Sequence, residues 1–263
     1  MQLSGKVAIV TGGGSGLGHA GALALARAGA RVVVADIDGD SAARTVAEIQ
    51  EAGGEARAVR ADAGVAADAE RAVAETAAAY GALHVLYNNA GVAWPLRDGF
   101  TPNVDPKVWD DVIRINLSSV FYFCHHAIPV MAAAGGGSII NTASSMAHLP
   151  LGGLDGYAAS KGGVAMLTKS LAAGCGAANI RVNAISPGYV DTPMNEIIFG
   201  SPELKAGFAA GHATGLQTPD EVADLVVFLA GDGSRSLTGA VLNCDRGWTA
   251  FKQPDALRGL PRP

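Results

Sequence analysis

Lys6-Val7-Ala8-Ile9-Val10-Thr11-Gly12-Gly13-Gly14-Ser15-Gly16-Leu17-Gly18 is the stretch of sequence that decides the fold. Its first five residues form a mainly apolar run, which is typical of a strand buried on both faces of a sheet. The Ala-rich segment after the glycines predicts a helix to about residue 28. A glycine turn between a strand and a helix N-terminus lets backbone N–H groups approach a phosphate. The pattern predicts a phosphate-binding turn in which Gly12, Gly16 and Gly18 matter most, with a plain flexible loop as the alternative.

A carboxylate ends the second predicted strand, Arg31–Asp36. Asp36 stands near the offset at which an acid binds the ribose hydroxyls of adenosine in dinucleotide-binding units. Such a carboxylate repels a 2′-phosphate, and the neutral neighbours Ser15 and Ile37 offer no compensating base. The sequence therefore favours NAD over NADP. The alternative is that Asp36 is one of several acids that lead into a helix capped by Ser41.

Strands and helices alternate along the rest of the chain. Further strands are predicted at 56–60, 84–87, 138–143, 180–185 and 241–244, and helices at 41–52, 68–80, 107–127, after residue 157, and at 219–231. Such alternation predicts βαβ units. With no linker or break in composition, we expect one doubly wound Rossmann-type α/β domain over residues 1–253. Its parallel sheet would have about seven strands, with helices on both faces, and residues 254–263 would form a Pro-rich tail.

Composition limits the classes of partner. The 263-residue chain has a net charge of −5 and a pI near 5.6, so no basic face is predicted for nucleic acid or an anionic membrane. It has no apolar run of about 18 residues that would predict a transmembrane helix, and its amino-terminal residues lack a signal-peptide layout. The cysteines are far apart and fit no metal-ligand spacing, which favours a reduced, cytoplasmic compartment. No metal is expected, because Cys124, His125 and His126 point in different directions on a helix.

Tyr157 and Lys161 are four residues apart where a helix is predicted, so both side chains lie on one face. A nearby ammonium stabilises phenolate and lowers the pKa of a tyrosine. Tyr157 then becomes a candidate proton donor and acceptor. An ordinary surface pair is the alternative, because this spacing alone is a weak signal.

Three turns at strand ends face the same expected crevice, since ligands of parallel sheets bind at the carboxyl ends of the strands. Asp62-Ala63 follows the third strand and is placed to contact an adenine edge. Asn88-Asn89-Ala90-Gly91 follows the fourth strand, and its alternative is a simple Asn/Gly turn. The fifth strand leads into Ser144-Ser145.

Together these motifs resemble the short-chain dehydrogenase/reductase family, from Leu3 to about Ala250. The motifs are Thr-Gly-x-x-x-Gly-x-Gly at 11–18, Asn-Asn-Ala-Gly at 88–91, Tyr-x-x-x-Lys at 157–161, Asn116 within a helix, the serine pair, and Pro187-Gly188. Each motif is weak alone, but their order along the chain makes the resemblance specific.

The resemblance implies a catalytic tetrad of Asn116, Ser145, Tyr157 and Lys161. Tyr157 would exchange a proton with the substrate oxygen, the serine would hold that oxygen, and Lys161 would depress the tyrosine pKa and bind the nicotinamide ribose. Asn116 would hold a water for proton relay; from the residues alone, a local structural bond was the other interpretation. The resemblance further implies these cofactor-binding residues: Gly12, Ser15, Gly16, Leu17, Gly18, Asp36, Asp62, Ala63, Asn88, Ala90, Gly91, Tyr157, Lys161, Pro187, Gly188, Val190 and Thr192.

The identity of the serine depends on how residues are counted. Counting along the motif with which this strand ends in the family selects Ser145. Counting back from the tyrosine by the number of residues usual in the family selects Ser144. Adjacent strand residues face opposite ways, so only one can point at the substrate. Ser145, with a one-residue deletion in the following loop, is the preferred interpretation.

Substrate identity is expected to depend on a pocket containing Trp94, His148, Leu151 and Asp155 and on a covering segment, residues 194–217. Phe199, Leu204 and Phe208 would form the segment's apolar inner face, or the segment would be a surface helix without a role in recognition. The family often has Asp-Gly-Gly where this chain has Asn243–Gly247, and Arg246 there would affect a subunit contact or a pocket wall.

The resulting hypothesis is an NAD-dependent alcohol dehydrogenase or ketone reductase for a small-molecule secondary alcohol or ketone. The alternatives are an acyl-thioester 3-ketoreductase and a nucleotide-binding sensor without catalysis. Family analogy implies a homotetramer, and the small residues Gly162, Gly163 and Ala165 would suit close helix packing between subunits or against the chain's own sheet.

Overall fold

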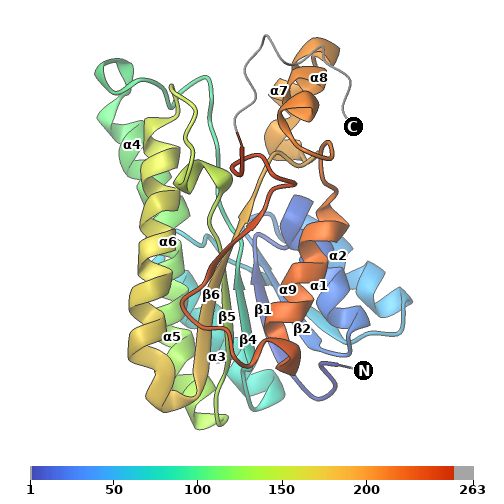
Figure 1. Ribbon diagram of the computed structural model, residues 1–263. Coiled ribbons are helices and arrows are strands. Elements are labelled where there is room, and N and C mark those ends of the chain that lie inside the picture. The colour runs from blue at the N-terminus through green and yellow to red at the C-terminus, as the bar shows by residue number, and fades with distance from the viewer. Residues whose placement is uncertain (1, 252–263) are drawn as a thin grey trace.

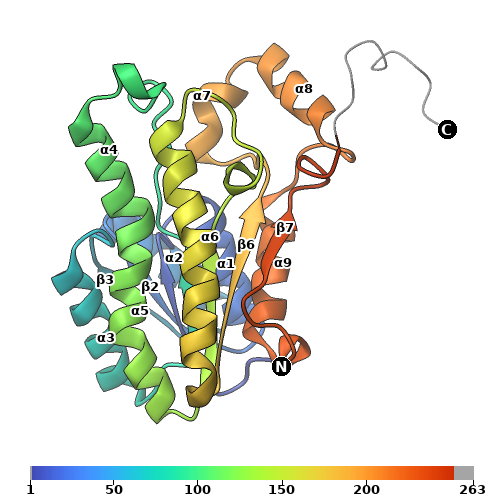
Figure 2. The same ribbon diagram turned by 60° about the vertical axis from the view of Figure 1, so that its left-hand side comes forward.

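Seven parallel strands form one sheet with helices on both faces in the computed structural model, which describes residues 2–251 (Figure 1, Figure 2). The strands follow the order β3-β2-β1-β4-β5-β6-β7 across the sheet. In chain order they are β1 Val7–Thr11, β2 Arg31–Asp36, β3 Ala56–Arg60, β4 Val85–Asn88, β5 Gly137–Thr142, β6 Ile180–Pro187 and β7 Val241–Cys244. The predicted doubly wound α/β domain is confirmed. The predicted tail, 254–263, lies outside the described residues.

Two groups of helices cover the sheet. On one face lie α1 Gly16–Arg27, α2 Gly39–Glu51 and α9 Pro219–Ala230, and on the other lie α3 Ala66–Tyr80, α4 Pro106–Ile113, α5 Ser119–Ala133 and α6 Asp155–Cys175 (Figure 1). The short helices α7 Glu196–Phe199 and α8 Pro202–Gly211 stand beyond the carboxyl ends of the strands (Figure 2). Single 3₁₀ turns occur at Thr101–Asn103, Ser145–Ala147, Gly176–Ala178, Pro193–Asn195 and Asp232–Ser234.

Alternation along the strands divides the interior into two cores. Ile9 and Val33 enter the core under α3, α5 and α6, whereas their neighbours Val10 and Val34 enter the core under α1, α2 and α9. Because both faces of the strands are buried, apolar residues occur at consecutive positions, as the sequence indicated.

The helix predicted over 107–127 proved to be two helices. A π-helical turn, Arg114–Ser118, separates α4 from α5, and α5 continues through Pro129 to Ala133. A π-helical turn contains one residue more than an α-helical turn. The apolar pattern of the helix before it and of the helix after it stays intact, so helical periodicity does not reveal the turn.

The cap predicted for α2 was also wrong. Asp38, not Ser41, caps the helix, because the Asp38 carboxylate accepts hydrogen bonds from the backbone N–H groups of Asp40 and Ser41.

The order of the strands determines where ligands can bind. β1 lies between β2 and β4, and the chain crosses from one side of β1 to the other at this point. In open parallel sheets the crevice at such a switch point is the usual binding place. In residues 2–251, no helix combines the length and hydropathy needed to cross a membrane.

Candidate active site

The glycine turn after β1 lies against the turn after β4. Gly12 has φ +63°, and a Cβ there would come within 2.9 Å of the Ala90 Cα. Gly16 has φ +54°, which also favours glycine. Both line a cavity at the carboxyl edge of the sheet, together with Ser15 and Leu17. The turn thus offers the backbone approach that a pyrophosphate requires.

Gly18 has a different role from the one predicted. It is buried and absent from the cavity wall, and a Cβ there would lie 2.0 Å from the Gly12 carbonyl oxygen. Glycine at this position therefore lets α1 pack against the turn. Direct contact of Gly18 with a cofactor is not supported.

Asp36 lies on the cavity wall at the end of β2. Its carboxylate accepts hydrogen bonds from the backbone N–H of Gly14 at 2.9 Å and of Asp38 at 3.0 Å. These bonds fix a negative charge beside the glycine turn, where the sequence placed it.

Asp62 and Ala63 line the cavity beyond the end of β3. The Asp62 carboxylate accepts a hydrogen bond from the Gly64 N–H at 2.9 Å and pairs with the Arg114 guanidinium at 3.4 Å. Arg114 also lines the cavity but was missed, because it is 52 residues from Asp62 and lies in the unpredicted π turn.

In the turn after β4, the asparagine that lines the cavity is one position later than the predicted one. Asn88 is buried, and its amide nitrogen donates to the Asn141 side chain at 2.9 Å and to the Cys124 sulfur at 3.4 Å, so it ties the sheet to α5. Asn89 lines the cavity instead and donates to the carbonyls of Thr11 and Gly12. Successive residues of a strand face opposite ways, so the side chain next to Asn88 is the one that reaches the cavity. Ala90 and Gly91 line the cavity as predicted.

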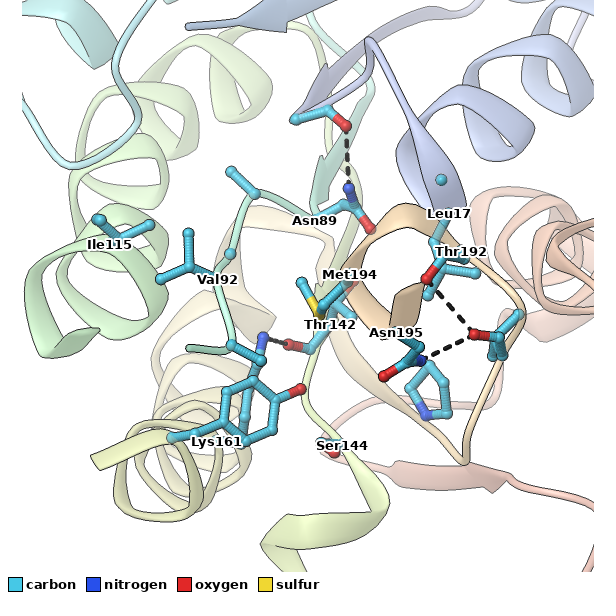
Figure 3. A pocket seen from close by; sticks show the side chains of 18 of the residues that line it. Leu17, Asn89, Val92, Ile115, Thr142, Ser144, Lys161, Thr192, Met194 and Asn195 are labelled. Carbon is cyan, nitrogen blue, oxygen red and sulfur yellow. Dashed lines mark hydrogen bonds between the residues drawn. The ribbon is translucent and has the colours of Figure 1, made fainter. Parts of the chain in front are cut away.

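Helix α6 brings Tyr157 and Lys161 to the same cavity. The buried Lys161 ammonium donates to the Thr142 carbonyl at the end of β5 at 2.7 Å, as Figure 3 shows. Its Nζ lies 5.8 Å from the centroid of the Tyr157 ring. The predicted proximity on one helix face is confirmed.

The predicted effect of Lys161 on Tyr157 is not found. Burial raises the pKa of Tyr157, and only a hydrogen bond with Ser144 acts in the opposite direction. Burial also lowers the pKa of Lys161 to about 8. The physical reason is that desolvation disfavours the charged form of both groups, while the ammonium faces the Thr142 carbonyl.

The serine beside Tyr157 is Ser144 rather than Ser145. Ser144 has extended backbone at φ −168° and caps the 3₁₀ turn that begins at Ser145. Its hydroxyl interacts with Tyr157 and accepts a hydrogen bond from the Met146 N–H at 3.1 Å. Both serines line the cavity. The 3₁₀ turn begins at Ser145, so the alternation of the strand no longer sets the direction of its side chain.

Asn116 is fully buried in the π turn and does not line the cavity. Its side chain accepts a hydrogen bond from the Val92 N–H at 2.7 Å and donates to the Val92 carbonyl at 2.9 Å and to the Ser160 hydroxyl at 3.1 Å. These bonds correspond to the local structural interpretation and hold the loop after β4 against α6.

The four residues expected in the substrate pocket do not line this cavity. Trp94 lies under the Arg97 guanidinium, His148 bonds Ser186, Asp155 bonds Thr101, and Leu151 is exposed. Neighbours that the sequence did not single out take their place: Val92, Ala93, Pro95, Met146 and Leu154. The loops follow no period, so the sequence carried no signal for which neighbour turns inward.

The first residues of the covering segment are the ones that line the cavity. Met194, Asn195 and Ile198 line the cavity, next to Pro187, Gly188, Val190 and Thr192. None of the three residues predicted for the inner face, Phe199, Leu204 and Phe208, lines the cavity itself. Leu204 is exposed, whereas Phe208 faces inward and packs on Tyr189 of the cavity wall, with ring centroids 4.2 Å apart. Met194, in the turn before α7, and Ile198, on α7, are the apolar residues of the segment that line the cavity, and no residue of α8 does.

Arg246 joins the end of the covering segment to α9. Its guanidinium donates to the Thr214 carbonyl at 2.7 Å and pairs with Glu221, in the first turn of α9. Arg246 does not line the cavity, and both of these contacts are within the chain.

Protein-family comparison agrees with this geometry. A family model described as "Enoyl-(Acyl carrier protein) reductase" matches residues 12–249. The chain is 38% identical over 250 residues to the cyclohexanol dehydrogenase of Acinetobacter sp. (strain SE19), covering 95% of this chain and 97% of that protein. It is 41% identical over 253 residues to the cis-4-hydroxycyclohexanecarboxylate dehydrogenase of Sinomonas cyclohexanicum, covering 93% and 97%.

A solved structure shows the same fold. The structure of a short-chain type dehydrogenase/reductase from Mycobacterium marinum superposes with a TM-score of 0.89 at 30% identity, covering 95% of this chain and 98% of that one.

Proposed function

The chain belongs to the short-chain dehydrogenase/reductase family, and we propose that it is an NAD-dependent enzyme that interconverts a secondary alcohol and a ketone. Relatives named as alcohol dehydrogenases support the coarser statement that it is an oxidoreductase acting on a CH–OH group. The finer proposal concerns the cofactor, the proton-transfer residues and the kind of alcohol.

One observation carries the proposal. A single cavity of about 380 Å³ extends from Asp36 and the glycine turn to Tyr157. It therefore joins a site suited to a dinucleotide with a buried, protonated phenol. Ligand pockets of about 300–1,000 Å³ are typical of cofactor and small-molecule sites.

The residues of the cavity fit a nicotinamide dinucleotide. The glycine turn would receive the pyrophosphate, Asp36 the adenosine ribose, and Asp62 with Ala63 the adenine. The fixed carboxylate of Asp36 favours NAD over NADP, because it would repel a 2′-phosphate. Bound at this place, the cofactor supplies the hydride acceptor or donor, while the protein supplies position and field.

Tyr157 would transfer the proton. Its hydroxyl is neutral near pH 7, because burial raises its pKa, so it can donate to a carbonyl oxygen in the reductive direction. Ser144 would hold the same oxygen, which is a stabilising contact for charge that develops there. In the oxidative direction Tyr157 would accept the proton of the alcohol, so it must first lose its own proton. A positive charge nearby would stabilise the phenolate that forms, and Lys161 is placed to provide that charge once the cofactor is bound.

The substrate end of the cavity is mainly apolar. Its walls come from the loop after β4, the serine turn and the covering segment: Val92, Pro95, Met146, Leu154, Met194 and Ile198. Such walls suit a small or medium-sized alcohol with a hydrocarbon body. Because two relatives are named for cyclohexane-based alcohols, we propose a cyclic secondary alcohol.

The decisive test is NADH formation from NAD⁺ with a panel of cyclic and acyclic secondary alcohols, with Tyr157→Phe as the matched variant. We expect turnover in the wild type and a loss of at least about 10²-fold in the variant, which lacks only the proton-transferring hydroxyl. Equal turnover in both proteins would exclude Tyr157 as the acid/base. NAD⁺ binding without turnover of any alcohol, or of ketones with NADH, would instead indicate the non-catalytic sensor.

An acyl-thioester ketoreductase would need basic residues at the pocket mouth to bind an acidic carrier. Among the described residues that line the cavity, the cations are Arg114, which is paired with Asp62, and Lys161, which lies at its floor. A 3-oxoacyl thioester in the panel tests this alternative directly.

We also propose a homotetramer, by family analogy. A Cβ at Gly163 would meet Leu117 of the same chain, whereas a Cβ at Gly162 would meet no atom within 4 Å in the described chain. Gly162 thus leaves a flat surface on α6, next to the exposed Met166. Light scattering after size-exclusion chromatography measures the assembly, and a monomer would exclude it.

A further inference from the structure

Tyr189 carries a polar group for which the proposed reaction has no use. The residue lines the cavity, and only 7% of its surface is exposed. Its hydroxyl is buried and has no hydrogen-bond partner among residues 2–251. Buried hydroxyl groups nearly always have a partner, because leaving one unpaired costs the free energy of its lost hydration.

The surrounding aromatic rings hold Tyr189 in place. Its ring centroid lies 4.2 Å from that of Phe208 and 5.0 Å from that of Trp248. The backbone N–H of Tyr189 also lies 3.4 Å from the His212 ring nitrogen. A ring packed in this way cannot turn its hydroxyl out to bulk water without disturbing the cluster.

The Tyr189 hydroxyl is close enough to Tyr157 for the two groups to interact electrostatically. Burial raises the pKa of Tyr189, and ionisation of Tyr157 would raise it further. Tyr189 therefore stays neutral at physiological pH and can donate a hydrogen bond. Tyr189 and Tyr157 line the same cavity, and their interaction places Tyr189 near the residue that is proposed to transfer the proton.

Two polar side chains on the same loop as Tyr189 are already paired. The Thr192 hydroxyl and the Asn195 amide both donate to the Val190 carbonyl, at 3.4 and 2.8 Å, as Figure 3 shows. The Ser144 hydroxyl faces Tyr157. Tyr189 is thus a donor whose partner is expected to come from a ligand.

We propose that the Tyr189 hydroxyl donates a hydrogen bond to a second oxygen of the substrate. The substrate class is then a secondary alcohol or ketone that carries another acceptor, such as a hydroxyl, a carbonyl or a carboxylate, on the same hydrocarbon body. This inference rests on the proposed function, because the second oxygen is defined relative to the carbon that reacts beside Tyr157.

Pairs of substrates that differ only in a hydroxyl and a methyl group test the inference. Cyclohexane-1,2-, 1,3- and 1,4-diols are compared with the corresponding methylcyclohexanols, in the wild type and in Tyr189→Phe. For the best diol, we expect the diol-to-methyl ratio of kcat/KM to fall about three- to tenfold in the variant, mainly through KM, since one neutral hydrogen bond is lost. Tyr122→Phe, on α5 and away from the cavity, is the control that should keep the wild-type ratio.

A second measurement does not depend on turnover. Tyr189→Phe removes an unpaired buried hydroxyl, so its Tm should equal that of the wild type or exceed it by up to about 3 °C. A clear fall in Tm would show that the hydroxyl has a partner within the protein, and would overturn the inference. An unchanged diol-to-methyl ratio would overturn it as well.

The two proposals can fail separately. If no alcohol or ketone reacts with either cofactor, the proposed function is refuted. Whether Tyr189 donates to a ligand oxygen is then decided by thermal shift in the presence of NAD⁺. A diol that raises Tm more than its methyl analogue, only when Tyr189 is present, supports that hydrogen bond, and equal shifts overturn it.

Discussion

Asp98 holds Tyr157 by its backbone. The Asp98 carboxylate, 1% exposed, accepts hydrogen bonds from the N–H of Tyr157 at 2.7 Å and of Gly156 at 3.0 Å. In return, the Asp155 carboxylate accepts from the N–H and hydroxyl of Thr101, at 2.8 and 2.6 Å. These reciprocal bonds clamp the loop after β4 to the first turn of α6. The charge of Asp98 also complements the positive end of the helix that carries Tyr157 and Lys161.

Replacing Asp98 with Asn should therefore affect both stability and catalysis. The amide keeps one acceptor oxygen but loses the charge and the second bond, so we expect a loss of about 0.5–2 kcal/mol in the free energy of unfolding. Displacement of Tyr157 should lower kcat about tenfold or more. Urea unfolding and steady-state kinetics measure the two effects.

Asp105→Asn is the matched control. Asp105 caps α4 by accepting from the Lys107 N–H, and it does not line the cavity. Because Asn caps a helix about as well as Asp, this variant should change stability little and keep kcat. Equal kcat losses in both variants would show that Asp98 has no specific influence on Tyr157.

The two serines should differ in their effect on catalysis. Ser144→Ala removes the hydroxyl next to Tyr157 and should lower kcat about 10²–10³-fold, as for other donors to a developing oxyanion. Ser145→Ala should lower kcat less than about tenfold. The comparison needs only steady-state kinetics with one good alcohol, and the reverse order would restore Ser145 as the catalytic serine.

Lys161→Met should alter the dependence of stability on pH. Burial lowers the pKa of Lys161 from 10.5 to about 8, which corresponds to about 3 kcal/mol. Below pH 8 the folded protein bears the full cost of a buried ammonium. Between pH 8 and 10.5 the folded state has lost this proton while the unfolded state still binds it, so the cost disappears as the pH rises.

The stability of the wild type relative to Lys161→Met should consequently increase by up to about 3 kcal/mol between pH 8 and 10.5. Urea unfolding of both proteins at pH 7 and pH 10 measures this difference. Parallel pH profiles would mean that Lys161 titrates normally in the fold.

Asp36→Asn should relax the choice of cofactor. The amide keeps an oxygen that can accept from the Gly14 N–H, but it removes the charge that would repel a 2′-phosphate. We expect the affinity for NADP⁺ to rise about tenfold or more, because a like-charge contact near a protein surface costs over 1 kcal/mol. Fluorescence titration with NAD⁺ and NADP⁺ measures both affinities, and an unchanged ratio would contradict the assignment of Asp36.

Contacts between distant residues were beyond prediction for a physical reason. Asp98 is 59 residues from Tyr157, and Arg114 is 52 residues from Asp62. Neither pair follows a period of a helix or strand, and both depend on how loops fold back over the sheet. The direction of the pKa change at Tyr157 also escaped prediction, because it depends on burial rather than on the spacing to Lys161.

By itself, the sequence determined the sheet, the glycine turn, Asp36, and the pairing of Tyr157 with Lys161 on one helix. These features depend on interactions between near neighbours: apolar runs, glycine conformations and helix periodicity. Only the tertiary structure showed that Asn89 rather than Asn88 lines the cavity, and that Ser144 is the serine that interacts with Tyr157. A strand turns adjacent side chains to opposite faces, and where the strand ends and the next turn begins is decided by packing against the rest of the molecule.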